Sequence, residues 1–223
     1  MGIKGPKDRY GDVEIQPGIR RFVWEHAQIV RDILCDIWKS GLTISGAKCV
    51  FGSPRIDIVS MVCDVDGRRP EQKKIAKILD WPTPRTTKEA RGFIGLCVYY
   101  RIFVKDFSTI ALPILLLFRK NVVFLWTVDC QTAMDRLKEL LTMTPILVSL
   151  DFLATAGLIV LSVDVSLTGW GTILQQVQPD GSLKPARYES GIWTGSELNY
   201  DAVKLECHGL LKALKRLRYW LFG

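Results

Sequence analysis

Two hydrophobic periods along this chain predict where it forms helices and where it forms strands. Apolar residues that recur every three or four positions indicate amphipathic helices. Strict alternation of apolar and polar residues from Ile159 to Val165 indicates a strand with one buried face, and shorter strands are expected between 42 and 65. The helical period is carried by segments 21–39, 70–81, 86–99, 108–118, 127–144 and 203–221.

The predicted helix over 86–99 has two dissimilar sides. Thr86 and Glu89 form a capping box that starts it. Two glycines on one exposed side cost about 1 kcal/mol each relative to alanine, which calls for a compensating contact. Either this side lies close to a nucleic-acid backbone, or another helix packs there. The expected buried stripe is Ala90, Phe93, Ile94, Cys97 and Val98, and the opposite side holds Lys88, Gly92, Gly95 and Tyr99.

Two carboxylates stand beside the long strand and the last helix. Alternation places Asp164 on the face opposite Val163 and Val165. Glu206 lies roughly 70° from the centre of the apolar face of its helix, where helix and sheet are expected to meet. A pair of this kind suits a divalent metal, and the alternative is a solvated Asp with an ordinary surface Glu. The apolar face is predicted to contain Val203, Cys207, Leu210, Leu211, Leu214, Leu217 and Leu221.

Composition limits the cellular compartments and the binding partners that we expect for this protein. The net charge of +7 is concentrated in residues 41–121, which hold 14 Lys and Arg against 7 Asp and Glu and therefore suit a polyanion such as nucleic acid. The 6 cysteines include no Cys-x-x-Cys pair, so we expect reduced core thiols rather than a zinc site. The longest uncharged apolar run, Ile110 to Phe118, is far too short to span a bilayer. We expect an intracellular, soluble protein of the cytoplasm or nucleus that uses no small-molecule cofactor.

The order of several motifs resembles a known family of proteins. Asp80-Trp81-Pro82-Thr83-Pro84, Ala90 to Leu96, Tyr99-Tyr100-Arg101, Phe124-x-Trp126-Thr127 and Pro145-Ile146-Leu147 resemble the reverse transcriptase thumb and connection of gypsy-type LTR retrotransposons. Ser162 to Ser166, Gly169 to Gln176, Tyr188-Glu189-Ser190 and Asn199-Tyr200-Asp201 ahead of Glu206 resemble the start of the ribonuclease H domain in the same polyproteins.

The resemblance implies an α+β chain with three parts. Residues 1–70 would be the C-terminal remnant of the polymerase palm, 71–150 the thumb and connection helices, and 151–223 the N-terminal part of a ribonuclease H-like domain with a mixed sheet and one packed helix. It also implies RNA/DNA hybrid or duplex as a partner, contacted through Lys88, Gly92, Gly95, Tyr99 and Arg101, together with the remainder of the polyprotein. The family's Phe-Leu-Gly-His hairpin reads Ile58-Val59-Ser60-Met61 here, so the glycine that allows close backbone approach is replaced.

The same resemblance assigns chemistry to the two carboxylates. Asp164 matches the first and Glu206 the second of four acidic residues that hold Mg²⁺ for hybrid cleavage in the family. The polymerase Tyr-x-Asp-Asp hairpin has no counterpart in these 223 residues. We therefore expect a reverse transcriptase/ribonuclease H fragment that is inactive alone. The alternatives are a non-catalytic remnant that binds nucleic acid or protein, and a degraded gene product with no selected role.

Overall fold

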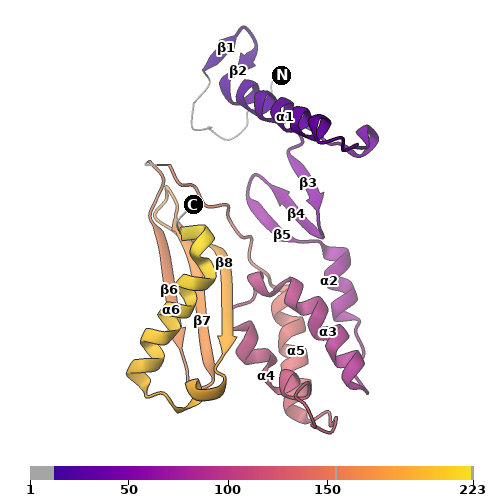
Figure 1. Cartoon of the computed structure of the whole chain (residues 1–223), viewed down its shortest axis with the longest axis vertical. Helices are drawn as coiled ribbons and strands as arrows, with labels where there is room; N and C mark the ends of the chain where they lie inside the picture. The colour runs from indigo at the N-terminus through magenta and orange to yellow at the C-terminus, as the bar shows by residue number, and fades with distance from the viewer. Residues whose placement is uncertain (1–12, 154, 222–223) are drawn as a thin grey trace. The chain divides into compact units, whose positions relative to one another are not determined.

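The computed structural model describes residues 13–153 and 155–221 and divides the chain into two compact units. The first unit ends at Pro54 and the second begins at Arg55. Each unit has its own secondary structure (Figure 1). The division expected at residues 70 and 150 stays a prediction. None of the helices among the described residues is both long and apolar enough to cross a membrane.

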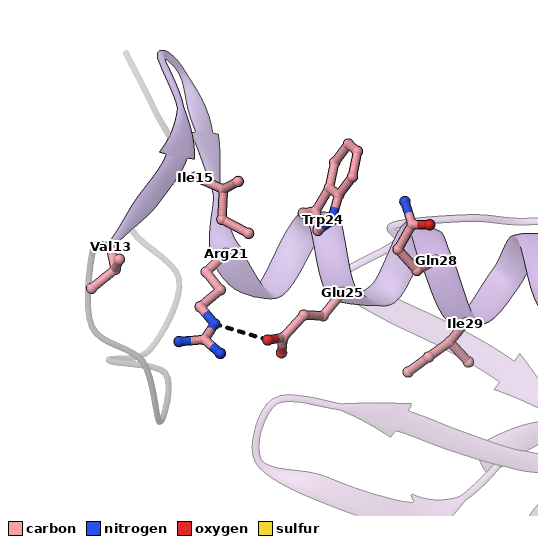
Figure 2. A pocket seen from close by; sticks show the side chains of 7 residues that line it. All are labelled: Val13, Ile15, Arg21, Trp24, Glu25, Gln28 and Ile29. Carbon is pink, nitrogen blue, oxygen red and sulfur yellow. Dashed lines mark hydrogen bonds and ion pairs between the residues drawn. The ribbon is translucent and has the colours of Figure 1, made fainter.

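The first unit consists of a short hairpin followed by one long helix. Strands β1 (Glu14–Gln16) and β2 (Ile19–Arg20) lead directly into α1 (Arg21–Lys39), and the short 3-10 helix η1 (Gly46–Lys48) follows. Figure 2 shows a pocket lined by Val13, Ile15 of β1 and Trp24 of α1, with Arg21 Nε 2.9 Å from Glu25 Oε1. No residue of this described helix is buried. Helices in proteins are stabilised mainly by packing of their apolar face. The described part of this unit does not bury that face of α1 and so supplies no hydrophobic core for it.

The second unit opens with an antiparallel sheet of strands β3 (Arg55–Ile58), β4 (Met61–Asp64) and β5 (Gly67–Pro70). The Asp66-Gly67 pair lies at the β4–β5 turn, where the sequence places a hairpin signal. The β3–β4 turn consists of Val59 and Ser60, whose φ angles are 46° and 59°. Both residues are therefore in the left-handed conformation that favours glycine or asparagine.

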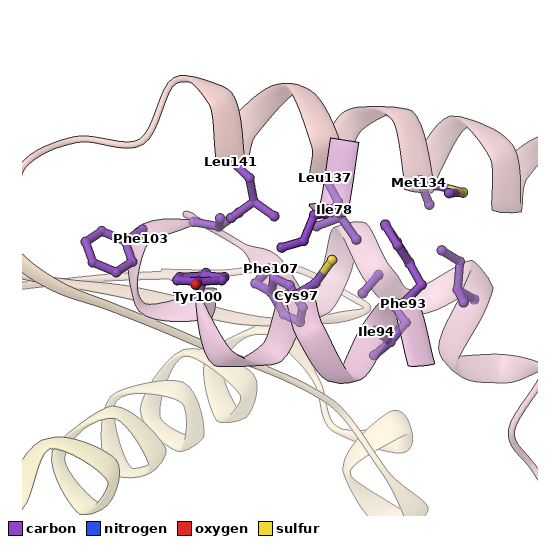
Figure 3. Packing of buried hydrophobic residues seen from close by; sticks show 14 of the residues in the cluster. Ile78, Phe93, Ile94, Cys97, Tyr100, Phe103, Phe107, Met134, Leu137 and Leu141 are labelled. Atoms are coloured by element: carbon purple, nitrogen blue, oxygen red, sulfur yellow. The ribbon is translucent and has the colours of Figure 1, made fainter. Parts of the chain in front are cut away.

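A helical layer forms the larger hydrophobic core. Its elements are α2 (Gln72–Leu79), α3 (Thr87–Tyr99), η2 (Arg101–Phe103), α4 (Phe107–Leu116) and α5 (Val128–Thr142). Figure 3 shows Phe93, Ile94 and Cys97 of α3 pointing into this core, into which Leu137 and Leu141 of α5 also project. Thr86 caps α3 as predicted, since its hydroxyl accepts from the Glu89 amide at 3.2 Å. The reciprocal half of the capping box differs, because the Glu89 carboxylate accepts from the Arg85 amide at 2.7 Å and not from that of Thr86. The predicted buried stripe of α3 is confirmed except for Val98, which is 37% exposed.

The last part of the unit is a sheet with one helix packed on it. Strands β6 (Ile159–Val165), β7 (Gly169–Val177) and β8 (Leu183–Ile192) are followed by η3 (Gly195–Asn199) and α6 (Ala202–Leu221). The α+β class is confirmed, but every strand pair in the described part of this sheet is antiparallel, whereas a mixed sheet was expected. Consecutive strands joined by short turns can only pair in this direction. Asp201 is the expected cap of α6, because its carboxylate accepts from the Lys204 amide at 2.8 Å.

The face of α6 that meets the sheet differs from the prediction. Its buried residues are Leu205, Gly209, Ala213 and Leu217, and only Leu217 belongs to the predicted stripe. Val203, Cys207, Leu210, Leu211 and Leu214 are exposed instead. Small residues let the helix lie close to the strands: a Cβ added at Gly209 would lie 2.5 Å from Val165 Cγ2. Bulky indoles from the sheet side, Trp170 and Trp193, fill the space that leucines on the helix would otherwise occupy.

Candidate carboxylate site and nucleic-acid interface

Asp164 lies on the face of the sheet that is turned away from α6. Leu161, Val163 and Val165 of β6 pack with the core residues of α6, so the alternating Asp164 points the other way and is exposed. Its register partner on β7 is Gly171. A small pocket of about 70 Å³ on this side is lined by Asp164, Gly171 and Lys105 among others.

A second carboxylate, Asp106, lies on this same face and was not found from the sequence. It adopts a left-handed conformation, with φ of 55°, directly before α4. A Cβ added at Gly171 would overlap the Asp106 carboxylate, so the absence of a side chain on β7 makes room for it. Burial raises the pKa of Asp106, the ammonium of Lys105 lowers it, and the charge of Asp164 raises it further. The contact joins residues far apart in sequence, so no local pattern could have indicated it.

Glu206 is exposed on α6, which packs on the opposite face of the sheet from Asp164. Within the described residues, no three His, Cys, Asp or Glu side chains come together closely enough to hold a metal ion. Carboxylate oxygens are the ligands that Mg²⁺ prefers, and several are needed in one octahedral shell. The joint use of Asp164 and Glu206 as metal ligands and catalytic residues therefore stays a prediction.

The residues predicted for the exposed side of α3 do lie on that side. Lys88, Gly92, Gly95 and Tyr99 are all exposed. A Cβ added at Gly92 would lie 3.2 Å from Trp81 Cζ2, so a neighbouring ring accounts for that glycine. Gly95 has nothing within 4 Å of its missing Cβ. It lines an open pocket of about 310 Å³ together with Lys74 and Lys77 of α2, Tyr99 and the β3–β4 turn.

Two tyrosines at the end of α3 hold the β3–β4 turn. The Tyr99 hydroxyl donates to the Val59 carbonyl, and the Tyr100 hydroxyl donates to the Ser60 carbonyl at 3.4 Å. The two rings meet edge to face with centroids 4.9 Å apart. The pKa of Tyr100 is raised, first by burial and then by the neighbouring Tyr99. The turn is thus anchored through its backbone, although it lacks the family's glycine.

Arg101 points to the sheet instead of the exposed side of α3. Its Nε lies 3.9 Å from Oε2 of Glu189, a carboxylate whose side chain is only 2% exposed. Arg187 and Arg216 also reach Glu189, at 2.6 Å and 3.2 Å. One buried carboxylate on β8 is therefore shared by arginines from η2, β8 and α6. A nucleic-acid contact by Arg101 stays a prediction.

The architecture of the second unit is a three-stranded antiparallel sheet with one packed helix, preceded by a helical layer. Residues 126–223 match the model of the RNase H-like domain found in reverse transcriptase. The resemblance to a retrotransposon reverse transcriptase that the motifs indicate is likewise confirmed by the relatives below.

The chain is 31% identical over 197 residues to the Tf2-3 and Tf2-4 transposon polyproteins of Schizosaccharomyces pombe, a match that covers 88% of the chain and 15% of each polyprotein. Its fold is similar to the foamy viral protease-reverse transcriptase solved with double-stranded DNA, with a TM-score of 0.71 and 22% identity over 90% of this chain and 35% of that one. The same viral enzyme solved with an RNA/DNA hybrid gives a TM-score of 0.68 over 87% of this chain and 26% of that one. The chain thus spans a small part of the length of the proteins that it resembles.

Proposed function

We propose that this chain is the connection and early RNase H-like portion of a retrotransposon reverse transcriptase, and that it binds duplex nucleic acid through the exposed side of α3. The observation that carries the proposal is the open surface at Gly95, flanked by Lys74, Lys77 and Tyr99. A helix surface without a side chain lets a sugar-phosphate backbone approach, and ammonium groups beside it neutralise phosphates. The solved relatives with duplex DNA and RNA/DNA hybrid support this choice of partner.

We further propose that these 223 residues bind the duplex without cleaving it. Asp164 and Glu206 would supply two carboxylates to Mg²⁺, which when bound stabilises the attacking and leaving oxygens of a phosphodiester. Asp164 and Glu206 lie on opposite faces of the sheet, and two carboxylates supply too few oxygens for the octahedral shell that Mg²⁺ requires. The predicted parts 1–70, 71–150 and 151–223 would act together with the rest of the polyprotein.

Salt-dependent binding of an RNA/DNA hybrid tests the interface. Lys74→Ala, Lys77→Ala and Lys88→Ala should each weaken binding and reduce the slope of log K against log salt by about 1, because each removes one phosphate contact. Tyr99→Phe should leave the slope unchanged. Lys215→Ala, on the exposed side of α6, is the matched control and should change neither quantity. Unchanged affinity in all three lysine variants would place the duplex elsewhere.

Hybrid cleavage is measured with the same protein. We expect no magnesium-dependent product from the 223-residue chain. Cleavage that appears with Mg²⁺ and disappears in Asp164→Asn would refute the proposal that the chain is catalytically silent. Binding and cleavage are read separately, so either proposal can fail alone.

A further inference from the structure

Two arginines and a tryptophan surround a pocket that the proposed function does not use. The pocket holds about 150 Å³ and lies where β5, the segment 148–152, β8 and the end of α6 meet. Its lining includes Arg68 of β5, Arg187 of β8 and Trp220 of α6, with Leu150 and Phe152 beside them. The guanidinium carbons of Arg68 and Arg187 lie 5.5 Å and 5.4 Å from the centre of the Trp220 ring. Both guanidinium groups therefore lie against the Trp220 ring, which forms part of the wall of the pocket.

Arg68 is incompletely satisfied in this position. Its Nη2 donates to the backbone carbonyl of Ala186 at 3.0 Å, which is a neutral acceptor. Its Nε is buried and has no hydrogen-bond partner among the described residues. Burial lowers the pKa of Arg68, and the like charge of Arg187 lowers it further. A buried guanidinium donor without an acceptor is unfavourable and would be stabilised by an anion.

The nearby carboxylate does not neutralise this pair of arginines. Glu189 accepts from Arg187 Nε at 2.7 Å, and its other oxygen faces Arg216 and Arg101. Its single negative charge is therefore distributed over three guanidinium groups. An excess of positive charge remains at the pocket, where Coulomb attraction is stronger than at an open surface.

We propose that Arg68, Arg187 and Trp220 form a binding site for a small oxyanion, the carboxylate or phosphate group of a small molecule. Guanidinium groups bind such groups through paired N–H donors, which gives both strength and orientation. A water molecule takes up about 30 Å³ of liquid, so the cavity has room for about five waters or for one compact anion. Leu150 and Phe152 would contact a short apolar body attached to the anion. Because the site joins β5 to β8, an occupant would also hold the sheet of β3–β5 to the sheet of β6–β8.

The test is a titration of the full 223-residue chain, labelled with ¹⁵N, at constant ionic strength. Sodium phosphate and sodium acetate each replace sodium chloride, and the arginine Nε–H resonances are followed by NMR. We expect a saturable shift of the Arg68 resonance, assigned by its loss in Arg68→Lys. Saturation with phosphate alone or acetate alone identifies the source of the oxyanion, and saturation with both shows that the site accepts either. No saturable shift with either anion overturns the proposal.

Variants separate this site from general salt effects, since phosphate also stabilises proteins by exclusion from their surface. Arg68→Met and Trp220→Leu should weaken anion binding roughly tenfold to a hundredfold, as expected for the loss of a charge-assisted hydrogen bond or its stacking partner. Arg119→Met, an exposed arginine after α4, is the control and should bind as the parent does. An equal anion response in Arg68→Met and the parent would overturn the site. If Arg68→Met does not fold, the parent titration and Trp220→Leu still decide.

Discussion

Replacing the β3–β4 turn with Asn-Gly should stabilise the second unit. Val59 and Ser60 have φ angles of 46° and 59°, which are the left-handed values of a two-residue hairpin turn. An ordinary L-residue in this conformation is disfavoured by roughly 1–2 kcal/mol, and the branched Cβ of valine makes the position more strained. The double variant Val59→Asn with Ser60→Gly removes both penalties.

The size of the gain follows from what the substitution leaves intact. Val59 is 73% exposed, so little apolar burial is lost. Tyr99 and Tyr100 bond to the turn through backbone carbonyls, which any residue retains. Glycine at position 60 makes the unfolded chain more flexible, which offsets about 0.5–1 kcal/mol of the relief. The expected net gain in the free energy of unfolding is about 1–2 kcal/mol.

Urea denaturation measures this gain, and thermal melting should show a rise of about 2–4 °C for each kcal/mol in a unit of this size. Val59→Ala is the control, because it removes the branched carbon but keeps a Cβ in the left-handed conformation, so a smaller gain is expected. An unchanged or lower free energy of unfolding in the Asn-Gly variant would refute the reasoning. It would mean that the turn does not need positive φ at both residues.

Three further changes probe the sheet and its helix. Gly209→Leu should destabilise the unit by about 1–3 kcal/mol through overpacking against Val165, whereas Leu211→Ala on the exposed side should change stability by less than about 0.5 kcal/mol in urea titrations. Glu189→Gln should cost roughly 3 kcal/mol by leaving its arginines without a buried carboxylate, with the same assay as readout. Glu197, held by the Lys212 ammonium and by His208, has its pKa lowered from 4.5 to about 2. Its stabilisation should therefore be complete above pH 4.5 and lost as pH falls toward 2, and the difference in melting temperature between the parent and Glu197→Gln should shrink over this window.

The sequence predicts helix starts, turns and buried faces correctly where residues close together in the chain determine them. The Thr86 cap fixes the start of α3, and the helical period then places Phe93 inside and Gly95 outside, as observed. The hairpin that Asp66-Gly67 signals and the Asp201 cap are equally local, and both are present, with Val65 and Asp66 in the turn and Gly67 opening β5. In these segments the side chain that determines the geometry lies within four residues of the backbone that it shapes.

The face of α6 could not be predicted in this way. A count of apolar residues predicts that Leu210, Leu211 and Leu214 pack on the sheet. In the structure Gly209 and Ala213 face the sheet instead. The decisive factor is the distance between helix and strand, which depends on Trp170 and Trp193 in another part of the chain. Sequence periodicity reports how apolar a face is and carries no information about how closely it must approach its partner.

The contacts of β8 and β7 make the helical layer and the RNase H-like sheet one structure. The Ser108 amide donates to the Ser190 hydroxyl at 2.9 Å, while Arg101 reaches the adjacent Glu189. Asp106 fits against Gly171 on the face that also presents Asp164. A side chain at position 171 would displace the start of α4, so glycine there keeps the helical layer close to Asp164, the predicted metal ligand. Continuous packing therefore connects the exposed side of α3 to Asp164. The proposed duplex would need this fixed geometry in order to bind α3 and reach Asp164 together.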